Sequence, residues 1–140
     1  PPRSPSSPLL TQGGMRFILT MGVLKAGLGL TLFFTLPALG YAAAVTQTAV
    51  FLYESLTQLA FAYPARRINT TPAPNKVLNI IIVASVALQV LTVTFPPLRT
   101  LLGLAPLDLS VAGFVVAALI LTVVGAETWS RRTARNRRAE

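Results

Sequence analysis

The stretch VLNIIIVASVALQVLTVTF, residues 77–95, decides the fold class of this chain. It contains no charged residue and is followed at once by Pro96 and Pro97. An apolar run of about 20 residues is long enough to cross the hydrocarbon core of a bilayer as a helix. Apolar and polar positions do not alternate along it, as they would in a strand of a membrane barrel. The stretch therefore predicts a membrane-spanning helix, closed by the two prolines.

Three further runs of the same kind flank this one. They cover residues 17–36, 42–63 and 109–127, and we expect Pro37 and Pro64 to end the first two, since proline interrupts a helix. Asp108 or Ser110 is placed to cap the first turn of the last run. Together with residues 77–95 they predict an all-α membrane protein, with four transmembrane helices in a bundle over residues 17–128.

Composition supports this fold class and removes several functions. The chain is 53% hydrophobic, has only 16 charged side chains (12 basic and 4 acidic) and contains no cysteine or histidine. A soluble domain usually has about a quarter charged residues. Disulfides, thiolate metal sites and histidine chemistry are excluded, and no phosphate-binding glycine loop or catalytic triad pattern is present. Nothing in these residues indicates a catalytic site or a bound cofactor.

Arginine and lysine predict the orientation, because cytoplasmic connections are enriched in both. They cluster before residue 17, in the 64–76 connection and in the tail 129–140, whereas the other two connections contain only Arg99. Both termini are therefore predicted to be cytoplasmic. Residues 1–16 form a proline-rich approach to the first span, and we interpret the tail as a solvated anchor, with anionic lipid and nucleic acid as the alternatives. The Pro-Pro-Arg start, without methionine, predicts a piece of a longer protein.

Glu54 is the candidate functional residue. Tyr63 lies about 14 Å further along a helix and Ala42 about 18 Å before it, so Glu54 is expected near the middle of the membrane. An ionisable group at this depth costs at least about 2.5 kcal/mol and marks a functional site by default. The alternative is a protonated glutamate that only packs against another helix.

Neighbouring polar residues bear on this interpretation. A polar stripe, formed by Gln47, Glu54, Thr57 and Gln58, recurs at helical spacing and is predicted to face into the bundle. Lys25 is the other charge within a span. We favour an interpretation in which Lys25 extends to the cytoplasmic interface over an ion pair with Glu54.

The order of four pieces resembles a known family. They are PPRSPSSPLLTQGGMRFIL (1–19), TAVFLYESLTQLAFAYPARR (48–67), TFPPLRTLLGLAPLDLS (94–110) and VVGAETWSRR (123–132). In this order they resemble the seventh to tenth transmembrane helices of a P-type cation-transporting ATPase of the calcium-pump kind. The resemblance implies a multi-pass protein of the bacterial plasma membrane. Its partners would be the remaining helices and cytoplasmic domains of the pump, the transported cation and lipid, but not nucleic acid.

The resemblance also implies roles for two residues. The eighth helix of calcium pumps supplies a glutamate to the cation site, and Glu54 occupies the matching place, which favours calcium or another hard divalent cation. Thr57 matches a position that is polar in several relatives and is a second candidate ligand. The parent pump would use ATP and magnesium in domains that these residues do not include. The alternatives are a small four-helix proton-coupled exporter and a stand-alone structural membrane subunit.

Overall fold

The computed structural model describes residues 12–69 and 74–136, and helices are the only regular secondary structure within them. The helices are α1 (Gln12–Ala38), α2 (Ala43–Ala60), α3 (Ala62–Asn69), α4 (Lys76–Thr94), α5 (Pro96–Leu101) and α6 (Leu109–Asn136). The expected all-α fold is confirmed for these residues. The predicted approach at residues 1–11 and the last four residues of the basic tail lie outside the described residues.

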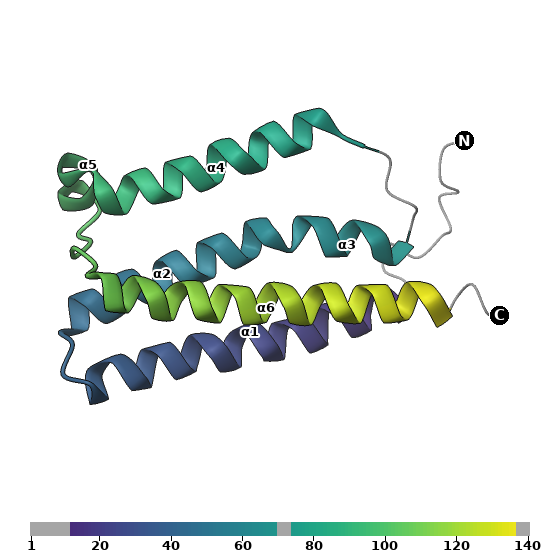
Figure 1. Cartoon of the computed structure of the whole chain (residues 1–140), viewed down its shortest axis with the longest axis horizontal. Coiled ribbons are helices and arrows are strands. Elements are labelled where there is room, and N and C mark those ends of the chain that lie inside the picture. The colour runs from purple at the N-terminus through teal and green to yellow at the C-terminus, as the bar shows by residue number, and fades with distance from the viewer. Residues whose placement is uncertain (1–11, 70–73, 137–140) are drawn as a thin grey trace.

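Three long helices surround the core. α1, α2 and α6 pack against one another, while α4 packs against α2 on the outside of this trio (Figure 1). α1 begins and α6 ends at the same end of the bundle (Figure 1). The assignment of that end to the cytoplasm remains a prediction.

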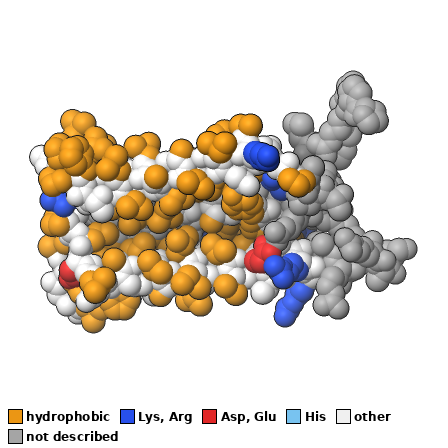
Figure 2. All heavy atoms as spheres, turned by 45° about the horizontal axis from the view of Figure 1, so that its top comes forward, with side chains coloured by type: hydrophobic (Ala, Val, Ile, Leu, Met, Phe, Trp, Pro, Cys, Tyr) orange, Lys and Arg blue, Asp and Glu red, His pale blue; other side chains and the backbone are white. Residues whose placement is uncertain are grey.

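Membrane-spanning character is clear for three helices. Among the described residues, α1, α4 and the Leu109–Thr133 part of α6 are long and apolar enough to cross a bilayer. On the face drawn in Figure 2, hydrophobic side chains cover the middle of the bundle, and charged side chains lie towards its two ends. α2 contains the predicted polar stripe and is not among these three, so its crossing remains a prediction.

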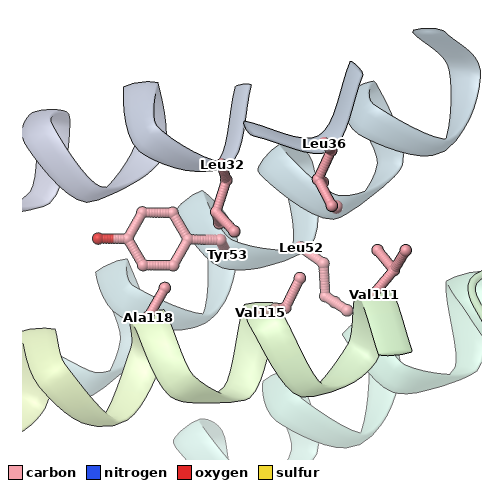
Figure 3. Close-up of a cluster of buried hydrophobic side chains, with 8 residues drawn as sticks. Leu32, Leu36, Leu52, Tyr53, Val111, Val115 and Ala118 are labelled. Carbon is pink, nitrogen blue, oxygen red and sulfur yellow. The ribbon is translucent and has the colours of Figure 1, made fainter. Parts of the chain in front are cut away.

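The core joins α1, α2 and α6 through one compact cluster. Leu32 and Leu36 from α1 meet Leu52 and Tyr53 from α2, and Val111, Val115 and Ala118 of α6 close the third side (Figure 3). In a second cluster near the start of α1, Phe17 packs against Phe61 and Trp129 with inclined rings, whose centroids are 6.2 and 5.5 Å from that of Phe17. The two clusters hold the three helices together along their length.

The first two predicted spans differ from the structure at their ends. α1 runs past Pro37 to Ala38, and the chain turns at Gly40, whose φ of 89° is the left-handed conformation that glycine adopts most easily. The second span does not end at Pro64. It is interrupted earlier, at Phe61, and continues as α3 to Asn69. Pro64 has no N–H to donate to the carbonyl of Ala60, four residues earlier, which explains why the break falls there.

The last two predicted spans agree more closely. α4 begins and ends within one residue of the predicted range, and Pro96 starts the short helix α5 in the connection after it. Asp108 caps α6, because its Oδ1 accepts a hydrogen bond from the Val111 N–H at 2.8 Å. α6 continues beyond the predicted residue 127 to Asn136, so the basic tail begins as helix.

The connection before α6 is tied to α2. The Thr48 hydroxyl accepts a hydrogen bond from the Ala105 N–H at 2.8 Å and donates to the Ala44 carbonyl at the same distance. Thr48 is fully buried. Its hydroxyl therefore satisfies a backbone donor that would otherwise lie unpaired in an apolar environment.

Candidate functional site

Glu54 lies on the seam between α1 and α2, close to the middle of α2. Its Oε2 is 2.6 Å from the Nζ of Lys25 in α1. The Lys25 side chain is only 15% exposed, whereas the Glu54 side chain is 41% exposed. The Glu54 side chain therefore reaches the surface of the described bundle, while most of the Lys25 side chain beside it is covered.

Lys25 has a second partner on α2. Its ammonium donates a hydrogen bond to Oε1 of Gln58, one helical turn beyond Glu54, at 2.8 Å. The preferred interpretation, in which Lys25 extends to the interface, is wrong for this structure. Lys25 and Glu54 face each other across two packed helices, and pairing neutralises both charges where water is scarce. The alternative weighed above, an ion pair, is the arrangement observed.

Gly29 creates the space in which the Glu54 carboxylate lies. A Cβ atom added at Gly29 would stand 2.8 Å from Oε1 of Glu54 and 3.4 Å from Cε1 of Tyr53. A Cβ atom does not tolerate the first distance, so any larger residue at this position would force the end of the Glu54 side chain to move from its observed place. Small residues commonly serve this purpose at membrane helix interfaces.

Thr57 is fully buried and bonded within its own helix. Its hydroxyl lies 2.8 Å from the carbonyl oxygen of Tyr53 and 3.0 Å from that of Glu54, and it donates to these backbone oxygens. Thr57 thus lies on the buried side of α2, in the same helical turn as Glu54. The two predicted ligands are neighbours in space, but only Glu54 reaches the surface.

The polar stripe does not face the bundle interior as a whole. Gln47 and Gln58 are exposed and Glu54 is half-buried, so the prediction of an inward-facing stripe is wrong for these three residues. Tyr53 takes the interior position between α1 and α6 instead. The stripe runs along the seam, where α1 covers only one side of it.

Tyr53 is the residue that sequence reasoning missed. It is fully buried, and its hydroxyl lies 2.8 Å from Oγ1 of Thr122 in α6 and 3.2 Å from the backbone carbonyl of Lys25 in α1. One hydroxyl thus links all three core helices beside the ion pair. The signal was available, because a tyrosine deep in an apolar span needs a hydrogen-bond partner for its O–H.

Two grooves meet at the ion pair. One, of 530 Å³, runs along the seam towards the start of α1 and includes Lys25, Gln58, Phe17 and Phe61 in its lining. The other, of 390 Å³, runs the opposite way and is lined by Gly29, Phe33, Val50 and Glu54 among others. The Lys25–Glu54 pair lies where they adjoin, and Glu54 is the only charged residue of the second lining.

The described residues do not form a complete cation site by themselves. No group of three or more acidic, histidine or cysteine side chains lies together within them. Calcium takes about six to eight oxygen ligands, so Glu54 could be one ligand among several and not a site by itself. The arrangement is suited to a shared site, in which other elements complete the coordination from the exposed side of the seam.

These features define the class of the protein: an integral membrane helical bundle with an ion-paired carboxylate on its α1–α2 seam. The comparison with family models is specific. Residues 1–132 match the family described as "Cation transporting ATPase, C-terminus", and the chain belongs to that family. The recognition made from the four sequence pieces is thereby confirmed at the level of cation-transporting P-type ATPases. Searches of curated proteins and of solved structures gave no match.

Proposed function

We propose that this chain forms the C-terminal membrane portion of an ATP-driven cation pump and that Glu54 is a ligand of the transported cation. The family supports the cation transport, and the placement of Glu54 supports the ligand role. A half-exposed carboxylate that borders a groove with an otherwise apolar lining is the single observation that carries the proposal, because such a group must face either water or a partner.

The ion we propose is calcium or another hard divalent cation, since a carboxylate oxygen is the ligand type that such ions prefer. The remaining ligands would come from transmembrane helices that cover the α1–α2 seam. ATP and magnesium would act in the cytoplasmic domains of the pump. The role of this chain is to hold one ligand in place and to support the helices that carry the others.

Thr57 supports Glu54 in this proposal. Its hydroxyl donates to the carbonyl oxygens of Tyr53 and Glu54, so it stabilises the turn from which the carboxylate projects. Contact with the cation itself would require its second lone pair to reach the seam. We therefore propose Thr57 as a positioning residue behind the ligand.

The test uses the intact pump with Glu54→Gln, which keeps the size of the side chain and removes its charge. We expect the calcium concentration for half-maximal ATPase activity to rise about tenfold or more, which corresponds to about 1.4 kcal/mol or more of lost binding. Phosphorylation by ATP at saturating calcium should persist. Gln47→Leu, an exposed change on the same helix, serves as the control and should leave calcium dependence unaltered. An unchanged calcium dependence in Glu54→Gln would make Glu54 a packing residue.

A further inference from the structure

The ammonium of Lys25 forms an ion pair with Glu54, the carboxylate that is proposed to bind the transported cation. Its Nζ lies 2.6 Å from Oε2 of Glu54, which is direct contact distance for a salt bridge. A divalent cation bound to the same carboxylate would stand within a few ångströms of this ammonium. In the low dielectric of a membrane bundle, two such cations repel strongly. Lys25 and a bound cation are therefore alternatives at Glu54.

The surroundings of Lys25 allow its ammonium to leave Glu54. Gln58 already accepts a hydrogen bond from Nζ at 2.8 Å, and both residues line the 530 Å³ groove that leads away from Glu54. This volume is many times the ~30 Å³ that one liquid water occupies. A displaced ammonium could thus keep Gln58 as a partner and gain hydration in the groove.

Other neighbours hold the backbone of Lys25 in place. Its carbonyl oxygen accepts a hydrogen bond from the buried Tyr53 hydroxyl. Gly29, one turn further along α1, lets the carboxylate approach the helix. The main chain is anchored, the ammonium lies on Glu54, and the groove that Lys25 lines offers room for a second position of the long side chain. This combination suits a reversible contact.

We infer that Lys25 is a tethered cation that neutralises Glu54 whenever the transported cation is absent, and that the incoming cation must displace its ammonium. The inference rests on the proposed function of Glu54 as a cation ligand. Its consequence is that Lys25 lowers the affinity of the site and prevents the empty pump from holding an unpaired carboxylate in the membrane. Release of the transported cation is then assisted by the return of the ammonium.

The experiment is a double-mutant cycle in the intact pump, with calcium as the probe. Wild type, Lys25→Met, Glu54→Gln and the double variant are compared by the calcium concentration for half-maximal phosphorylation by ATP. Competition predicts that Lys25→Met lowers this concentration by about fivefold or more, within the usual range of coupling between sites. The same substitution should have no effect once Glu54 is glutamine, because the contact that competes has been removed.

Lys25→Arg is the matched control, because it keeps the positive charge. We expect it to shift the half-maximal concentration less than Lys25→Met does. A second measurement applies even if Lys25→Met folds less well. Calcium should raise the apparent melting temperature of the detergent-solubilised Lys25→Met protein more than that of wild type, because the ion then replaces the missing positive charge beside Glu54.

The outcomes separate this inference from the proposed function. An unchanged or raised half-maximal concentration in Lys25→Met, with Glu54→Gln still impaired, overturns the tethered cation and leaves Glu54 a ligand. The inference is also overturned if Lys25→Met lowers the half-maximal calcium concentration equally with glutamate and with glutamine at position 54. Lys25 would then act through long-range charge repulsion and not through its contact with Glu54. No effect of Glu54→Gln overturns the proposed function and the inference together.

Discussion

Helices α2 and α4 lie side by side, yet the more apolar helix, α4, is the less buried of the two. α4 is among the helices apolar enough to span a membrane, and Ile82 is its single buried residue. α2 carries the polar stripe and contributes six buried residues, three of which are threonines. In a soluble protein the more apolar helix would be the inner one.

The difference shows what drives packing in a lipid environment. Lipid tails are as apolar as leucine, so a uniformly apolar helix gains little from contact with protein. Close approach and hydrogen bonding provide the gain instead, and α2 supplies both through Ala49, Thr48 and Tyr53. The polar helix is therefore central, and the apolar helix α4 serves as the outer face.

The largest expected effect on stability comes from comparing a buried leucine of α2 with an exposed leucine of α4. Leu52 in α2 is 9% exposed and Leu88 in α4 is 58% exposed. Leu52→Ala removes part of the core and should cost about 2–5 kcal/mol. Leu88→Ala should stay within about 0.5 kcal/mol, as surface changes usually do. Thermal unfolding of the detergent-solubilised protein measures both, and equal losses would contradict the assignment of inner and outer helices.

A smaller effect tests the hydrogen bonds of α2. Tyr53→Phe keeps the buried ring and removes the hydroxyl that contacts Thr122 and Lys25. We expect a loss of about 0.6 kcal/mol, the average for hydrogen bonds between membrane helices, and at most about 1.7 kcal/mol. Thr122→Val should have a similar effect, and combining the two should add little, because both remove the same bond. Fully additive losses would show that the hydroxyls act separately.

The close approach of α1 to α2 is tested by a pair of glycines. Gly29→Ala places a Cβ 2.8 Å from Oε1 of Glu54, whereas Gly22→Ala meets nothing within 4 Å. The first should shift the carboxylate and raise the half-activating calcium concentration about threefold, equivalent to about 0.7 kcal/mol. The second should leave calcium activation as in wild type. If Gly29→Ala left calcium activation unchanged, the Glu54 carboxylate could move aside without loss of cation binding, and its close approach to α1 would not matter.

The smallest effect concerns a buried polar atom of α4. Oε1 of Gln89 is buried and has no hydrogen-bond partner among the described residues. Gln89→Leu removes this unpaired acceptor at similar volume and should be neutral or slightly stabilising. A clear loss of thermal stability would indicate that Gln89 bonds to another part of the pump, and α4 would then be more than an outer face.

Much of this fold could be predicted from the sequence because membrane spans depend on length and apolarity. The run at residues 77–95 fixed α4 to within one residue, and Asp108 marked the start of α6. The ends near Pro37 and Pro64 were less predictable. A proline interrupts the hydrogen bond four residues before it, so the break fell at Phe61, and Gly40 set the end of α1.

The site was predictable in part. Glu54 stood out because a charge in a span is rare, but its partner depended on the register between α1 and α2. That register follows from packing at Gly29 and Tyr53, which sequence spacing does not reveal. The inner face of α2 was misjudged for the same reason, since Tyr53 entered the core and the glutamines stayed on the seam.

The most direct test of the central claim asks whether α2 crosses the membrane and so carries Glu54 to its middle. These residues contain no cysteine, so Ala42→Cys and Ala65→Cys can be introduced singly at exposed positions on either side of α2, with cysteines elsewhere in the protein replaced. We predict that an impermeant maleimide added outside intact cells labels position 42, and that position 65 is labelled only after the membrane is permeabilised. Labelling of both positions from the same side would contradict the account.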